Sequence, residues 1–209
     1  MKNILIHGLG QNETSWYMVS ANLKKRNIEV EQPNLYLMIK DIKMDYDTLF
    51  QEFANYCNSY HEKLNLCGLS LGGILSLDYA KKFPDKVNSI ILIGTPYKIP
   101  KLLFKLQGVI FYLMPEKAFK KMGYMKKDFM SLVKSMSNLD ISGDLDKLQC
   151  RVLITCGVRD NPNMAYARQL NKKIKGSSLM SISNSGHEVN IENPDKLSTI
   201  IYDFWLNPY

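Results

Sequence analysis

The sequence predicts an α/β fold: a doubly wound, mostly parallel sheet of six strands with helices on both faces and one inserted helical segment. Short apolar runs, often β-branched, alternate along the chain with segments of helical periodicity. Such alternation is typical of βαβ units joined by right-handed crossovers. Between residues 97 and 145 the alternation stops, and the chain becomes helical and Lys-rich. We therefore expect a core of residues 1–96 and 146–209 and a helical insertion of residues 97–145.

The composition is that of one globular domain. The chain has 209 residues, of which 45% are hydrophobic and 22% are charged. No stretch approaches the roughly 18 uncharged apolar residues of a membrane span, and the apolar run at the N-terminus is too short for a signal-peptide core. The four cysteines lack Cys-x-x-Cys spacing, so we expect reduced thiols. The prediction is a cytoplasmic protein with no metal and no cofactor.

The first part of the chain alternates regularly between strands and helices. Residues 2–6 end in the apolar, partly β-branched run Ile4-Leu5-Ile6 and predict a buried parallel strand. A helix capped by Asn12 or Thr14 follows, and residues 28–30 form a short expected strand that Pro33 closes. The next expected elements are a helix that starts at Asp45 or Asp47, a strand that ends at Leu69, a helix that ends near Pro84, and a strand over residues 87–93.

The strand pattern resumes after the insertion. Residues 150–156 predict a strand, and a helix starts after Asn161-Pro162, with proline in its first turn. Residues 178–182 predict the last strand. Asn193-Pro194 caps the final helix, whose apolar stripe consists of Leu197, Ile200, Ile201 and Phe204.

The predicted site is centred on Gly68-Leu-Ser70-Leu-Gly72, which lies between an apolar strand run and a helical pattern. A serine at such a sharp turn has a strained backbone, and only residues without a Cβ fit two positions before and after it. The turn exposes the Ser70 hydroxyl and leaves the Leu71 N–H at a helix N-terminus, where negative charge is stabilised. The pattern predicts a nucleophile, and an ordinary turn serine is the alternative.

Polar residues follow three other predicted strands at their carboxyl ends, which is where open α/β sheets bind ligands. His7-Gly8-Leu9 follows the first strand, Asp160 follows the strand that ends at Cys156, and His187 follows the last strand. A nucleophile, an acid and a histidine are therefore expected at one rim of the sheet, in chain order Ser, Asp, His.

These motifs resemble the α/β-hydrolase family over essentially the whole chain. The matching segments are His7-Gly-Leu-Gly10, Gly68-Leu-Ser-Leu-Gly72, Gly157-x-x-Asp160 and Gly186-His187. The resemblance implies a triad of Ser70, His187 and Asp160, an oxyanion hole, and a lid where the insertion lies. The chain begins directly at the oxyanion-loop strand, so the two N-terminal strands usual in the family are expected to be absent. For this reason six strands are predicted rather than eight.

The residue types define the role of each group. His187 would take the Ser70 proton, and Asp160 would bind the other ring nitrogen. The N–H groups of Leu9 and Leu71 would bind the oxyanion.

Each assignment has an alternative. Asp160 can be a helix cap instead, and His187 can be a surface-loop histidine. Some family members place the acid after the preceding strand, but Gly94-Thr95-Pro96 offers no carboxylate there. His7 precedes the Ser70 turn and lies in the loop that is expected to supply an oxyanion donor, so we expect a structural role for it.

The insertion carries most of the net charge and an unusual apolar helix. Residues 96–140 hold nine lysines and three acidic residues, a net +6 of the chain's +7. One predicted helix is apolar on two sides: Leu102, Leu106, Val109, Ile110 and Leu113 form one stripe, and Phe104 and Phe111 point the opposite way. We expect Phe104, Phe111 and Met114 to bind substrate; the alternative is that they form only the insertion's own small core.

The expected function is that of a serine hydrolase that cleaves a carboxylic ester of a small or medium apolar acyl group through an acyl-enzyme intermediate. One alternative is a thioesterase or acyltransferase for acyl-CoA or acyl-carrier substrates, whose phosphates or acidic surface the basic lid would meet. Another is a non-catalytic ligand-binding protein of the same fold, and serine-dependent carbon–carbon bond hydrolysis stays open. The expected partner is a small acyl ester. No nucleic acid is expected, because the lysines accompany no recognised motif, and the basic lid suits transient contact with a membrane or anionic surface. The sequence does not predict an oligomeric state.

Overall fold

The computed structural model describes residues 1–39, 42–99, 108, 111–121 and 125–206. The described residues contain one parallel sheet of five strands in the order β1-β2-β3-β4-β5. Its strands are β1 (Lys2–Ile6), β2 (Leu64–Leu69), β3 (Val87–Ile93), β4 (Arg151–Gly157) and β5 (Ser178–Ile182). The doubly wound α/β fold predicted from the sequence is confirmed, and the number of strands is corrected below.

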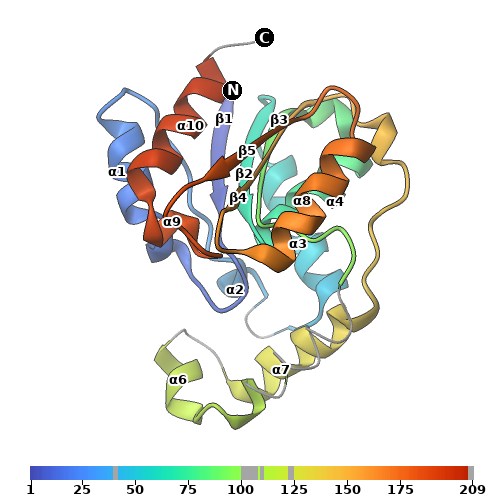
Figure 1. Ribbon diagram of the computed structural model, residues 1–209. Helices are drawn as coiled ribbons and strands as arrows, with labels where there is room; N and C mark the ends of the chain where they lie inside the picture. The colour runs from blue at the N-terminus through green and yellow to red at the C-terminus, as the bar shows by residue number, and fades with distance from the viewer. Residues whose placement is uncertain (40–41, 100–107, 109–110, 122–124, 207–209) are drawn as a thin grey trace.

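Helices cover both faces of the sheet (Figure 1). One face carries α1 (Tyr17–Lys24) and α10 (Pro194–Leu206), and the other carries α3 (Tyr46–Asn58), α4 (Leu71–Lys82) and α8 (Asn161–Lys173). Successive residues of β2 serve the two faces in turn. Leu64 and Leu66 belong to the core cluster under α3 and α4, whereas Cys67 and Leu69 belong to the cluster under α1 and α10. Because both faces are buried, the strand is mostly apolar, and its one polar side chain, Asn65, is buried as well.

The other helices lie in the connections between these elements and in the segment between β3 and β4. They are η1 (Glu13–Trp16), α2 (Leu35–Met38), η2 (Pro84–Lys86), α6 (Glu116–Lys121), α7 (Lys126–Ser135), η3 (Met136–Asn138), η4 (Leu145–Lys147) and α9 (Val189–Glu192). None of the helices in the described ranges has the length and apolar character needed to cross a membrane.

The sheet has one strand fewer than the six predicted. Residues 28–30 are irregular, and only Glu31 pairs with β1, in a single parallel bridge to Ile4. At this bridge the Leu5 N–H donates to the Glu31 carbonyl (2.9 Å). Pro33 follows two residues later, and because proline has no N–H it cannot extend the ladder. The expected sixth strand is thus reduced to one residue at the edge of the sheet.

The inserted segment leaves and re-enters the core at one place. The Ile99 N–H donates to the Leu139 carbonyl (3.1 Å), and the Ile141 N–H donates to the Tyr97 carbonyl (2.9 Å). Between these paired ends, α6 and α7 lie beyond the carboxyl ends of the strands (Figure 1). Phe129 of α7 is fully buried and belongs to the core cluster that also contains residues of α3 and α4. The insertion therefore packs at the edge of the sheet where the predicted site residues gather.

Candidate active site

Ser70 lies in the sharp turn between β2 and α4. Its φ is +51°, in the left-handed region, and its N–H donates to the Ile93 carbonyl of β3 (2.8 Å). A Cβ on Gly68 would lie 2.2 Å from the carbonyl carbon of Gly72, and a Cβ on Gly72 would lie 2.3 Å from the Ile6 carbonyl oxygen. Both positions therefore require glycine, and the close packing around them holds the strained serine in place.

Asp160 and His187 are in direct contact. The His187 Nδ1 lies 2.6 Å from the Asp160 Oδ2. Asp160 begins α8 just after β4 and is only 8% exposed, whereas the His187 side chain, in the loop after β5, is 40% exposed. Since a carboxylate only accepts, Nδ1 is the protonated nitrogen in this contact and Nε2 remains for another partner.

Asn163, one turn along α8, binds the same carboxylate. Its Nδ2 lies 2.9 Å from both oxygens of Asp160 and 3.2 Å from the His187 Nδ1. Burial favours the neutral carboxyl group, but the hydrogen bonds from His187 and Asn163 outweigh it and hold the pKa of Asp160 below its ordinary value. Asp160 is therefore ionised at neutral pH. Sequence reasoning missed Asn163, although an amide three residues after the acid was the available signal.

Gly94 connects the serine turn with the Asp160–His187 pair. It follows Ile93, whose carbonyl accepts the Ser70 N–H. A Cβ on Gly94 would lie 3.1 Å from the His187 Nδ1 and 3.3 Å from the Asp160 Oδ2. The end of β3 thus contacts the serine turn on one side and the pair on the other. All three predicted residues gather around one strand end.

Alanine at position 94 should impair both stability and activity. Gly94 has a φ of +52°, so alanine would add backbone strain and push against the imidazole. We expect Gly94→Ala to cost about 1–2 kcal/mol in the free energy of unfolding and to lower kcat about tenfold. Urea denaturation measures the first effect, and turnover of the ester substrates expected from the sequence measures the second. Gly143→Ala is the matched control, because no atom lies within 4 Å of the added Cβ; equal losses in both variants would contradict the close contact at Gly94.

The loop after β1 presents the first of the two predicted oxyanion donors. The Gly8 N–H faces the Gln11 Oε1 (3.4 Å), and the Gly10 N–H donates to the Tyr36 hydroxyl (3.2 Å). Among the described residues, neither the Leu9 N–H nor the Leu71 N–H forms a hydrogen bond. Both amides are therefore free to bind a ligand oxygen.

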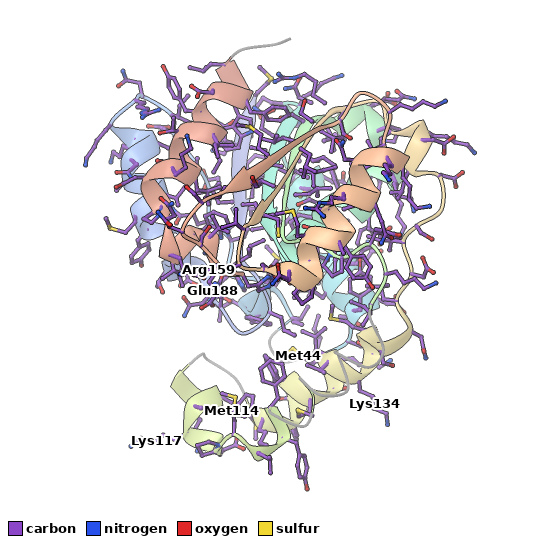
Figure 2. The ribbon with its side chains drawn as sticks, viewed as in Figure 1. Met44, Met114, Lys117, Lys134, Arg159 and Glu188 are labelled. Atoms are coloured by element: carbon purple, nitrogen blue, oxygen red, sulfur yellow. The ribbon has the colours of Figure 1, made fainter. Side chains whose placement is uncertain are left out.

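Gln11 joins this loop to the loop that carries His187. The Gln11 side chain is buried, and its Nε2 donates to the Glu188 Oε1 (2.9 Å). The Asn190 Nδ2 in turn donates to the Gln11 Oε1 (3.2 Å). Figure 2 shows Glu188 at the edge of the core that faces the insertion. Sequence reasoning did not single out Gln11, because its partners lie almost the whole chain away.

His7 is fully buried beneath the same loop. Its Nε2 accepts the Leu35 N–H of α2 (3.1 Å), and its Nδ1 lies 3.0 Å from the Gly8 carbonyl. Burial lowers the pKa of His7 to about 4, against the opposing effect of the Gly8 carbonyl. The ring is thus a neutral structural link between the loop and α2, as its place in the sequence suggested.

Acid should destabilise the protein partly through His7. The unfolded chain takes up a proton at this ring below about pH 6.5, whereas the folded chain does so only near pH 4. The neutral His7 ring therefore contributes its full stabilisation above about pH 6.5. As the pH falls from about 6.5 to 4, this contribution to the free energy of unfolding decreases by about 3 kcal/mol. His7→Gln cannot titrate, so its free energy of unfolding should fall less between pH 7 and pH 4 in urea denaturation. The exposed His61→Gln is the control; identical pH profiles for the wild type and His7→Gln would refute this account.

The predicted substrate-binding residues fall partly within the described chain. Phe104 lies outside the described residues. Phe111 is half-buried, with its ring edge-on to Phe129 at 4.9 Å between centroids, and Met114 is also half-buried. Figure 2 shows Met114 in the insertion, beyond the edge of the core that carries Arg159. Both described side chains pack on the core and keep an accessible surface.

The surface hollows described next do not belong to the cluster of Ser70, Asp160 and His187. Two surface hollows of about 600 and 390 Å³ lie elsewhere, one beside Lys2 and Glu62 and the other beside Lys81 and Asp144. Within the described ranges, no group of three or more His, Cys, Asp or Glu side chains is placed to hold a metal ion.

A comparison with known families shows the family to which the chain belongs. A family described as "Serine aminopeptidase, S33" (Hydrolase_4) matches residues 7–183, from the loop after β1 to the end of β5. The chain belongs to this family of α/β-hydrolases. The serine turn and the Asp160–His187 contact lie within or beside the matched region.

The hydrolase is similar to several curated proteins. It is 32% identical over 113 residues to the uncharacterized protein Rv2715 of Mycobacterium tuberculosis, a match that covers 51% of this chain and 33% of that protein. It is 22% identical to mouse monoacylglycerol lipase ABHD6 over 96% of this chain and 74% of the lipase. The match thus spans about a third of the mycobacterial protein's length.

Solved structures share the fold of the hydrolase. An enol-lactonase from Burkholderia xenovorans superposes with a TM-score of 0.80 at 18% identity, covering 99% of this chain and 92% of that one. A thermophilic esterase from Thermogutta terrifontis superposes with a TM-score of 0.79 at 19% identity, covering 98% and 89%. At such identities the likeness shows the fold alone.

Proposed function

We propose that this hydrolase cleaves carboxylic esters with a small or medium apolar acyl group, using Ser70 as nucleophile, His187 as general base and Asp160 as the acid that orients it. The observation that carries the proposal is the 2.6 Å contact between Asp160 and His187 at the strand end that also binds the Ser70 turn. A serine hydroxyl is a poor nucleophile at neutral pH and needs such an adjacent base.

In the first step the Ser70 Oγ attacks the ester carbonyl carbon. The hydroxyl proton passes to the His187 Nε2, because Nδ1 is bound to Asp160. The ionised Asp160 stabilises the imidazolium and keeps the ring in this tautomer. The imidazolium then gives its proton to the leaving alcohol, and an acyl-serine remains.

The tetrahedral intermediate carries a negative charge that needs hydrogen-bond donors. The Leu71 N–H lies at the N-terminus of α4, where the helix dipole favours an anion. The Leu9 N–H is the second proposed donor, on the loop held by Tyr36 and Gln11. Loss of one such donor typically costs about 10²–10³ in rate. Water activated by His187 then releases the acid and restores Ser70.

The insertion of residues 97–145 is proposed as the lid and as part of the acyl site. It lies beyond the carboxyl ends of the strands, and Phe111 and Met114 keep accessible apolar surface there. Apolar side chains with flexible thioethers suit acyl chains of varied shape. Three of the similar proteins, a monoacylglycerol lipase, an esterase and an enol-lactonase, are named for ester substrates, and they support an ester as the substrate, whereas the family model and one relative are named for peptidases.

The proposal is tested with p-nitrophenyl esters from acetate to dodecanoate beside the matching acyl-CoA thioesters. We expect hydrolysis that is fastest with short and medium acyl chains, and slower turnover of thioesters. Turnover of thioesters in preference to esters, falling steeply with salt, would favour the acyl-CoA alternative. Absence of turnover with every substrate would overturn the proposal.

A further inference from the structure

The loop that carries His187 is bound on both sides of the histidine by one carboxylate. The Gly186 N–H donates to the Glu192 Oε2 (2.9 Å), and the Glu188 N–H donates to the Glu192 Oε1 (3.2 Å). The two donors belong to the residues directly before and after His187. Glu192 therefore fixes the backbone at the position from which the imidazole projects.

The same carboxylate also reaches the turn that carries the catalytic acid. The Arg159 Nη2 lies 2.9 Å from the Glu192 Oε2, and it also donates to the Asn184 carbonyl (2.9 Å). Arg159 directly precedes Asp160, and its N–H donates to the Ser185 carbonyl (3.0 Å). The ion pair thus ties the loop after β4 to the loop after β5.

The short helix α9 brings the Glu192 carboxylate to the backbone N–H groups on both sides of His187. The Glu192 N–H donates to the Glu188 carbonyl (2.8 Å), so the chain turns back and brings the Glu192 side chain over the start of its own loop. A third of that side chain is exposed. The N–H of Gly186, and to a lesser degree Arg159, lower the pKa of the Glu192 carboxyl, so it stays ionised at neutral pH.

We propose that Glu192 is a positioning residue for the reaction: its carboxylate binds the backbone on both sides of His187 and, through Arg159, sets that loop against the turn of Asp160. The inference rests on the proposed function, since it assigns a role in orienting the general base. A displacement of about 1 Å at a reacting group can cost about 10² in rate. The bonds at Gly186 and Glu188 oppose such a displacement of the imidazole.

The test compares Glu192→Ala, Glu192→Gln and Arg159→Ala with the wild type, using a p-nitrophenyl ester. Glu192→Ala should lower kcat about 30- to 100-fold with KM nearly unchanged, because the ring is misplaced while the acyl site is intact. Glu192→Gln keeps one acceptor oxygen and should lose only about tenfold. Arg159→Ala should lose less than Glu192→Ala, because both backbone bonds remain. The double variant should lose less than the product of the two single losses, since both changes remove the contact between Arg159 and Glu192.

A second readout does not depend on turnover. The short hydrogen bond between His187 and Asp160 should give a downfield proton resonance in the wild type, and this signal should weaken or vanish in Glu192→Ala. Glu31→Gln is the matched control: it removes the ion pair with Lys2 (2.6 Å) at the edge of the sheet, and both activity and the resonance should be retained.

The outcomes separate the two proposals. An inactive wild type would defeat the proposed function. An active wild type whose Glu192→Ala variant keeps its kcat and its resonance would overturn the role of Glu192. The role of Glu192 would also be overturned if kcat fell only because the variant has a lower melting temperature. In that case the resonance would be unchanged at a temperature where the variant is folded.

Discussion

Ser70→Ala should lower kcat/KM for ester hydrolysis by about 10⁴-fold or more. Alanine removes the Oγ that attacks the substrate, and no other side chain can replace it in the turn. The backbone should stay unchanged, because the φ of +51° is held by the packing of Gly68 and Gly72 rather than by the hydroxyl. Substrate binding should therefore survive, and a competitive ester analogue should bind the variant as it binds the wild type.

The control for this variant lies on the same helix. Ser76→Ala removes a buried hydroxyl that donates to the Gly72 carbonyl (2.7 Å) but leaves Ser70 in place. It should retain activity within about twofold, because alanine is a good helix former. If Ser70→Ala kept substantial activity, or if both variants lost activity equally, Ser70 would not be the nucleophile.

Asp160→Asn should be the second large effect, lowering kcat about 10³- to 10⁴-fold. The amide has nearly the shape of the carboxylate, but it can present an NH₂ group to the His187 Nδ1 and favour the wrong tautomer. The variant also lacks the negative charge of the Asp160 carboxylate, which would stabilise the His187 imidazolium when it forms. Kinetics over a pH range measure the effect, and Asp203→Asn, exposed on α10, is the control. Activity of Asp160→Asn within tenfold of the wild type would contradict the assigned role.

The same variant has a predicted stability profile. The pKa of Asp160 is held below 3.8 in the folded protein, so the ionised carboxylate stabilises the fold at pH values above the unfolded pKa. This contribution is lost as the pH falls through the folded pKa. Asp160→Asn should therefore be less stable than the wild type at pH 7, and the difference should shrink below about pH 4.

The sequence was sufficient to predict the fold class and the contact between Asp160 and His187. Gly68 and Gly72 fixed the turn, because no Cβ fits at either position, and the left-handed φ of Ser70 agrees with that interpretation. Parallel strands end at one edge, so Asp160 and His187 could be expected to meet, and they lie 2.6 Å apart. These inferences succeed because local sterics and sheet topology determine them.

The remaining details depend on contacts that no local pattern reveals. Whether residues 28–30 pair with β1 depends on how closely the chain approaches the edge of the sheet. In this segment, only Glu31 pairs with β1. The partners of the site residues, Asn163, Gln11 and Glu192, come from loops that fold against one another. Glu192 lies five residues after His187, a spacing that becomes meaningful only once the chain turns back at α9.

The most direct test of the account is to treat the protein with a fluorophosphonate and to locate the modified residue by peptide mass spectrometry. A base-activated Ser70 predicts one stoichiometric adduct on the peptide that contains it, with labelling slowed strongly in Asp160→Asn and unchanged in Asp203→Asn. Ester hydrolysis by a protein that is labelled at another residue, or is not labelled at all, would contradict the account.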